Sequence, residues 1–137
     1  MIPPQLVVDA SAAAALVTAG DGFVQLAAIE LHAPHLLRSE LAATLRQQEH
    51  RGVLPAGAAD VGLSRLLEAT IRYSGRSADL VEALDVARSL GWAKTYDAEY
   101  LVLARRLRCP VVTLDARLQR GGGRIAPVLG LAEIDVG

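Results

Sequence analysis

Two short apolar runs constrain this chain most, because each of them leads directly into an aspartate. The sequence LVV at residues 6–8 precedes Asp9, and VVTL at residues 111–114 precedes Asp115. Short continuous runs of this kind are typical of strands that are buried on both faces of a parallel sheet. Open α/β sheets place their ligands at the carboxyl ends of such strands. We therefore expect Asp9 and Asp115 to lie close together at a functional edge of the sheet.

The rest of the chain alternates strand and helix patterns. We expect strands at 6–9, 31–33, 111–114 and within 128–136, helices at 11–18, 23–30, 35–51, from Pro55 to about Ile71, at 77–90 and at 96–107, and a flexible loop at 120–124. Such alternation predicts a three-layer α/β/α fold around a central, mainly parallel sheet. A length of 137 residues without repeats or a linker predicts one domain over 1–137.

Composition excludes several classes of protein. No apolar stretch approaches the roughly 18 residues of a membrane span, and the amino-terminal residues lack the pattern of a signal peptide. A single cysteine, Cys109, fits a reducing compartment, so we expect a cytoplasmic protein with no membrane association. The net charge of −1 gives no general attraction to nucleic acid.

Two further acids accompany the strand-end pair. Glu40 lies inside a predicted helix beside its apolar stripe, and Asp97 heads the stripe of another helix. Two carboxylates about 4 Å apart repel by about 1 kcal/mol in water and about 4 kcal/mol at an effective dielectric constant of 20. Four acids at one point therefore need protons or a divalent cation. Oxygen ligands favour Mg²⁺, and the absence of a Cys/His pattern argues against zinc.

Helix capping is the alternative explanation for three of these acids. Asp9 precedes the helix expected at 11–18, which begins at Ser11, Asp97 lies in the first turn of the helix expected at 96–107, and Asp115 precedes the segment 116–118. Aspartate and serine are preferred N-caps at the start of helices. The chain could then be a non-catalytic binding module. An aspartate-based phosphatase or a receiver domain is disfavoured, because Ser11 replaces the second aspartate that such phosphatases carry and the only lysine, Lys94, lies in a predicted loop.

Four motifs occur in order along the chain: VDAS at 8–11, RSEL at 38–41, YDAEYLVLA at 96–104 and VTLDARL at 112–118. Together they resemble the PIN-domain ribonucleases, and among these the VapC-type toxins of toxin–antitoxin modules. The resemblance implies a PIN-like fold and an endoribonuclease that leaves a 5′-phosphate. It assigns the catalytic positions to Asp9, Glu40, Asp97 and Asp115.

The resemblance also implies ligands and partners. Asp9, Asp97 and Asp115 would hold Mg²⁺ or Mn²⁺, while Ser11 and Thr113 would orient the carboxylates or the substrate. The partners would be an RNA substrate, a cognate VapB-type antitoxin and a second copy of the chain. The apolar first two helices would line the dimer interface or the antitoxin groove.

Several residues near these motifs have more than one interpretation. Arginines that could hold phosphates are Arg38, Arg117 and Arg120, and aromatic residues that could stack a base or anchor a loop are Trp92 and Tyr96. Glu99 departs from the usual family pattern, and we expect it to face solvent.

Overall fold

Strand β1 (Gln5–Val8) lies at the centre of a five-stranded sheet in a computed structural model that describes residues 3–134. The strand order is β3-β2-β1-β4-β5, and every pairing among these strands is parallel. The other strands are β2 (Glu30–Ala33), β3 (Ile71–Tyr73), β4 (Val111–Thr113) and β5 (Val128–Gly130). The apolar side chains of β1 and β4 are almost all buried, which explains the continuous hydrophobic runs of the sequence.

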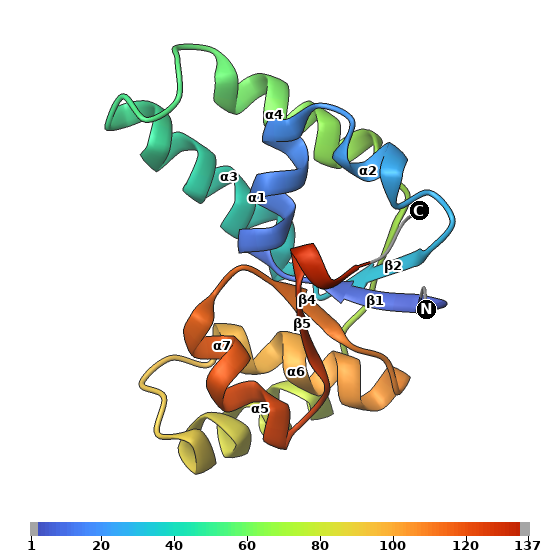
Figure 1. Cartoon of the computed structure of the whole chain (residues 1–137). Coiled ribbons are helices and arrows are strands. Elements are labelled where there is room, and N and C mark those ends of the chain that lie inside the picture. Colours follow the sequence, from blue (N-terminus) through green and yellow to red (C-terminus); the bar gives the residue numbers. More distant parts are fainter. Residues whose placement is uncertain (1–2, 135–137) are drawn as a thin grey trace.

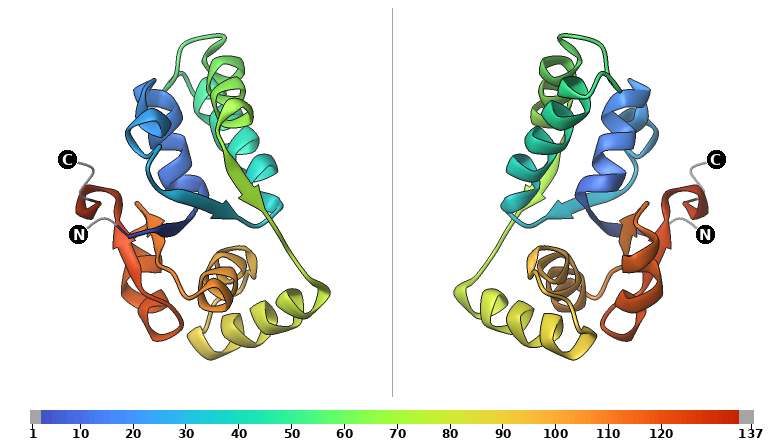
Figure 2. Two further views of the ribbon diagram at one scale, coloured as in Figure 1. Left: turned by 90° about the vertical axis from the view of Figure 1, so that its right-hand side faces the viewer. Right: turned by 90° about the vertical axis from the view of Figure 1, so that its left-hand side faces the viewer.

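Helices cover both faces of the sheet, which makes three layers (Figure 1). One face carries α1 (Ala10–Ala19), α2 (Gly22–Gln25), α3 (Leu36–His50) and α4 (Ala58–Glu68). The other carries α5 (Ser77–Leu90), α6 (Tyr96–Leu107) and α7 (Ala116–Gly121), and the two groups lie above and below the twisted sheet in Figure 2. Short 3₁₀ helices occupy Gly122–Arg124 and Leu131–Glu133. The predicted three-layer α/β/α class is confirmed.

The strand order creates a switch point beside β1. The chain first builds outward from β1 to β2 and β3, then crosses back through α5 and α6 to place β4 on the opposite side of β1. Val8 pairs with Val112, so Asp9 and Thr113 follow next to each other at the carboxyl edge of the sheet. In open parallel sheets this switch point is where a crevice for ligands forms.

Two features determine how the layer formed by α1 to α4 packs: the apolar stripe of α3 and the close contact of Gly22 with α1. Leu37, Leu41 and Leu45, spaced four residues apart on α3, are completely buried. Gly22 lies so close to α1 that an added Cβ would stand 2.5 Å from the carbonyl oxygen of Leu16. Only glycine fits there without movement of the backbone.

Three local predictions were wrong. The helix expected at 23–30 ends at Gln25, and Glu30 already begins β2. Ile71 belongs to β3 and not to the preceding helix. The sequence did not indicate this strand, because three residues are too few to show an alternating pattern. The loop expected at 120–124 is helical. Of the edge strands expected at 128–136, β5 is present, and residues 135–136 lie outside the described part.

Two expectations from composition can be compared with the structure. Within residues 3–134, none of the helices combines the length and the apolar character that crossing a membrane would require. Cys109 is 5 % exposed, and burial raises the pKa of its thiol to about 11. It is therefore a neutral, buried side chain just before β4.

Candidate active site

Asp9 lies at the carboxyl end of β1 and is 4 % exposed. Its Oδ1 accepts hydrogen bonds from the amide of Ala12 (2.9 Å) and from Ser11 Oγ (2.8 Å), so it also caps α1. Its Oδ2 accepts from the hydroxyl of Thr113 at the end of β4. Burial is the largest influence on the Asp9 carboxyl and raises its pKa although these three donors act in the opposite direction.

The hydroxyls of Ser11 and Thr113 join the two strand ends. They lie 3.1 Å apart, and Ser11 Oγ accepts the amide of Leu114 at 2.9 Å. Thr113 Oγ1 accepts the amide of Asp115 at 2.9 Å and donates to Asp9. Both hydroxyls therefore hold the Asp9 carboxylate in one orientation across the β1–β4 pair.

Glu40 reaches this edge from the second turn of α3. Its Oε1 accepts a hydrogen bond from the hydroxyl of Tyr100, at 2.5 Å. The Tyr100 ring is completely buried, and burial followed by the nearby charge of Glu40 raises the pKa of its hydroxyl. Tyr100 is therefore a permanent donor that fixes one carboxylate oxygen of Glu40.

Asp97 approaches from the first turn of α6. Its Oδ2 is paired with the guanidinium of Arg117 on α7, and that guanidinium lies over the Trp92 ring at 5.4 Å from the centroid. The N-cap position of α6 belongs to Thr95. The capping explanation therefore does not describe Asp97.

Asp115 caps α7 at the end of β4. Its Oδ1 accepts the amide of Arg117 at 2.9 Å, and its own amide donates to Thr113. Asp115 is thus linked to Asp9 through the Thr113 hydroxyl, while its carboxylate faces the start of α7.

Three of the four predicted acids interact through their charges. Asp97 raises the pKa of the Asp9 carboxyl, and Asp97, Asp9 and Glu99 raise the pKa of the Glu40 carboxyl, in both cases after the larger contribution of burial. Residues that are 31 to 88 positions apart in the chain therefore share one electrostatic environment (40 minus 9, and 97 minus 9).

The donor set fits a hard divalent cation in its chemistry. All the acids present oxygen ligands, and a cation would relieve the charge repulsion that contributes to the raised pKa values of Asp9 and Glu40. In this arrangement, however, no three His, Cys, Asp or Glu side chains among residues 3–134 are spaced to hold a metal ion together. The positive charge at Asp97 is supplied by Arg117.

Sequence reasoning missed two of these contacts. Tyr100 lies three residues after Asp97 and therefore on the same side of α6. This spacing could have indicated that the Tyr100 hydroxyl lies near the acids. No pattern indicated that Arg117 would bridge from α7 to Asp97.

The expectation that Glu99 faces solvent was wrong. Its side chain is half-buried and lines the wall of a 380 Å³ cavity. Burial raises the pKa of its carboxyl.

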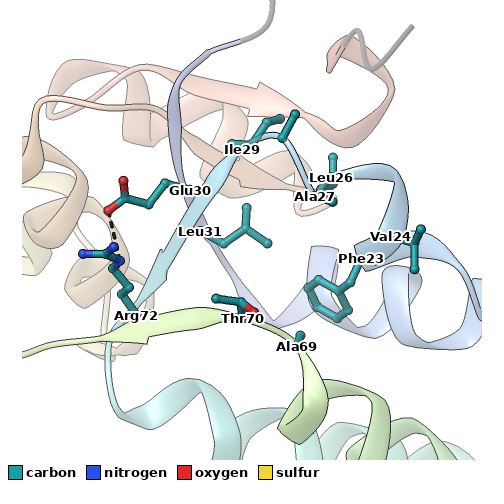
Figure 3. Close-up of a pocket in the computed structure, with 11 residues that line it drawn as sticks. Phe23, Val24, Leu26, Ala27, Ile29, Glu30, Leu31, Ala69, Thr70 and Arg72 are labelled. Carbon is teal, nitrogen blue, oxygen red and sulfur yellow. Dashed lines mark ion pairs between the residues drawn. The ribbon is translucent and has the colours of Figure 1, made fainter.

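A larger cavity lies away from the acids. Its volume is 550 Å³, and residues around the amino-terminal ends of β2 and β3 line it (Figure 3). The side chains of Phe23, Leu26 and Leu31 form apolar parts of its wall, and Glu30 pairs with Arg72 at 3.2 Å. Since the acids occupy the carboxyl edge, this cavity is at the opposite edge of the sheet.

Comparison with known proteins agrees with this arrangement. The PIN domain family model matches residues 6–123. The chain is 38% identical over 125 residues to Ribonuclease VapC9 of Mycobacterium tuberculosis and, to the same extent, to VapC ribonuclease Mb0985 of Mycobacterium bovis, covering 90% of this chain and 95% of each relative.

Solved structures share the fold. PAE2754 from Pyrobaculum aerophilum matches with a TM-score of 0.75 and 26% identity over 93% of this chain and 91% of that one. FitAcB from Neisseria gonorrhoeae matches with a TM-score of 0.57 and 13% identity over 90% and 96% of the two chains, which is a likeness of fold alone. The order of the four motifs, the acids at the switch point and these similarities agree, and the chain belongs to the PIN domain family, within its VapC type.

Proposed function

We propose that this chain is a divalent-metal-dependent endoribonuclease and the toxin of a toxin–antitoxin pair, acting as one domain in the cytoplasm. One observation carries the proposal: the Asp9, Glu40 and Asp97 carboxyls come from three separate elements and lie beside the β1–β4 switch point, where the charge of Asp97 raises the pKa of Asp9, and the charges of Asp97 and Asp9 raise the pKa of Glu40. The VapC relatives are named as ribonucleases, which supports ribonuclease activity for this chain.

Asp9, Asp97 and Asp115 are the proposed ligands of Mg²⁺ or Mn²⁺, with Glu40 completing the acidic set. When bound, such an ion lowers the pKa of a water and neutralises charge on the phosphate. Ser11 and Thr113 keep Asp9 oriented through the hydrogen bonds at its two oxygens. Asp97 would be free to hold the ion only when its ion pair with Arg117 is broken.

Glu40 is the proposed base of the reaction. Its Oε1 is held by the Tyr100 hydroxyl, so Oε2 is the oxygen that is available to accept a proton from the attacking water. Its pKa is raised by burial and by the neighbouring acids, which makes it a better proton acceptor than a solvent-exposed glutamate. In-line attack on an RNA phosphate would leave a 5′-phosphate.

Exposed apolar surface supports the proposed protein partners. On the face of the sheet that carries α1 to α4, a 510 Å³ groove between the end of α1 and the start of α4 is lined by Leu54, Pro55 and Val61, and Val61 is 50% exposed. On the opposite face, which carries α5 to α7, Leu80 and Val81 of α5 are 59% and 64% exposed. We propose that these two surfaces bind the two protein partners, a VapB-type antitoxin and a second copy of the chain.

A non-catalytic binding module is the second candidate, because Asp9 and Asp115 do make capping hydrogen bonds. Cleavage of total RNA with and without Mg²⁺ by the antitoxin-free chain separates the two. Asp97→Asn should abolish cleavage and leave the circular dichroism spectrum unchanged. Asp85→Asn is the matched control, since Asp85 is a carboxylate on α5 with a 72% exposed side chain that pairs with Arg88 of the same helix. A folded wild-type chain that cuts no RNA at any Mg²⁺ concentration would contradict the nuclease.

A further inference from the structure

Arg117 is the one basic side chain that forms an ion pair with a predicted site acid among the described residues. Its backbone amide is fixed by Asp115, and its guanidinium extends to Asp97. Within residues 3–134 it therefore connects two of the three proposed metal ligands. A guanidinium keeps its charge at every ordinary pH, so only movement or a competing cation can free Asp97 from it.

We propose that Arg117 is an internal counter-ion that occupies Asp97 before metal binding and exchanges with the incoming divalent cation. The inference rests on the proposed function, because it requires Asp97 to be a metal ligand. Its physical basis is that a guanidinium and a divalent ion at the same carboxylate repel each other, so that binding of one weakens binding of the other.

The surroundings of Arg117 allow this exchange. Its side chain is 57% exposed, so the guanidinium is already partly hydrated and moves without a large desolvation change. Asp97 is 26% exposed and would be left with an unbalanced charge if the guanidinium moved away without a replacement. Loss of the ion pair is therefore favourable only when another cation arrives.

Trp92 provides a place for the released guanidinium. Its ring already lies 5.4 Å from the guanidinium carbon, within the range of a cation–π contact. Gly121 lies against the same ring, since an added Cβ would be 3.4 Å from Trp92 Cζ2. Trp92 lies in the loop between α5 and α6, and its ring packs against α7. A guanidinium that leaves Asp97 can therefore move further over this ring, which changes the surroundings of Trp92.

Exchange would also prepare the site for RNA. A guanidinium released from Asp97 presents paired N–H donors beside the metal, and this geometry suits two oxygens of a phosphate. Metal loading and exposure of a phosphate-binding group then become one event. The expected order is metal first and RNA second.

The test is a Mg²⁺ titration of the full chain, free of antitoxin, followed by calorimetry and by the fluorescence of Trp92, the only tryptophan. Arg117→Gln should bind Mg²⁺ about fivefold tighter than the wild type at low salt, because an exposed ion pair of this kind is worth up to about that factor. The wild type should show a fluorescence change on saturation that the variant lacks. Arg117→Lys keeps the charge and should bind with intermediate affinity.

Arg124→Gln is the control, since it removes the same charge from an exposed position just after α7 and should leave Mg²⁺ affinity and the Trp92 signal unchanged. Equal Mg²⁺ affinity in the wild type, Arg117→Gln and Arg124→Gln would overturn the exchange while leaving the metal site intact. Absence of Mg²⁺ binding in all of them, and equally in Asp97→Asn, would instead remove the proposed function itself. Folding of each variant is checked by urea unfolding.

Discussion

Thr113→Val tests how the buried Asp9 carboxylate is stabilised. Valine has nearly the same shape as threonine, and Thr113 is completely buried, so the change removes a hydroxyl without opening a cavity. The lost bond is the one that Thr113 donates to Asp9, and the amide of Asp115 loses its acceptor as well. The backbone pairing of β1 with β4 remains.

The expected loss of stability follows from these two bonds. A hydrogen bond to an ionised group contributes about 1.5–3 kcal/mol, and an unpaired amide in a half-buried position adds about 1 kcal/mol. The extra methyl group of valine returns less than about 1 kcal/mol. We therefore expect Thr113→Val to lower the free energy of unfolding by about 3 kcal/mol at neutral pH. In an Asp9→Asn background the same change should cost only about 1 kcal/mol, because the bond then joins uncharged groups.

The pH dependence has a definite sign. Burial places the folded pKa of Asp9 above its unfolded value, so ionisation of Asp9 destabilises the fold. This destabilisation is absent below the unfolded pKa, grows as the pH rises, and is complete above the folded pKa. Thr113 lowers the folded pKa, so removing it raises that pKa further and widens the window. The cost of Thr113→Val should be smaller in mild acid than at neutral pH.

The assay is urea unfolding of the four proteins of the cycle, followed by circular dichroism at both pH values. A cost of Thr113→Val that is equal in the wild-type and Asp9→Asn backgrounds would refute the reasoning, since Thr113 would then act through packing alone. A cost that grows toward acid pH would refute the assignment of the Thr113 hydroxyl as a group that lowers the pKa of Asp9.

Three further predictions concern the base and the packing. Tyr100→Phe removes a donor that lowers the pKa of Glu40, so the acidic limb of the pH profile of Mg²⁺-dependent cleavage should move to higher pH. Glu99→Gln removes a charge that raises the pKa of Glu40, so the same limb should move to lower pH; equal directions in the two profiles would show that Glu40 is not the base. Gly22→Ala should lower the free energy of unfolding by about 2 kcal/mol or more through its clash with the α1 backbone, whereas Gly123→Ala, whose Cβ meets nothing within 4 Å, should be nearly neutral in urea unfolding.

The sequence alone determined the class of the fold and the strand ends that carry acids. Buried parallel strands require apolar side chains on both faces, so the runs before Asp9 and Asp115 were visible without any tertiary information. The stripe of α3 and the limits of α6 were equally clear, because helical periodicity is a local property. The edge strand β3 was missed, since three residues are too few to show a period.

Only the tertiary structure decided which charges meet. Strand order places β4 beside β1 and brings Thr113 to Asp9 across 104 residues, and helix packing brings the Tyr100 hydroxyl to Glu40 across 60. Sequence patterns record which face of an element is buried, but the partner of a polar side chain depends on how whole elements dock against one another. The guanidinium of Arg117 at Asp97 is a consequence of that docking.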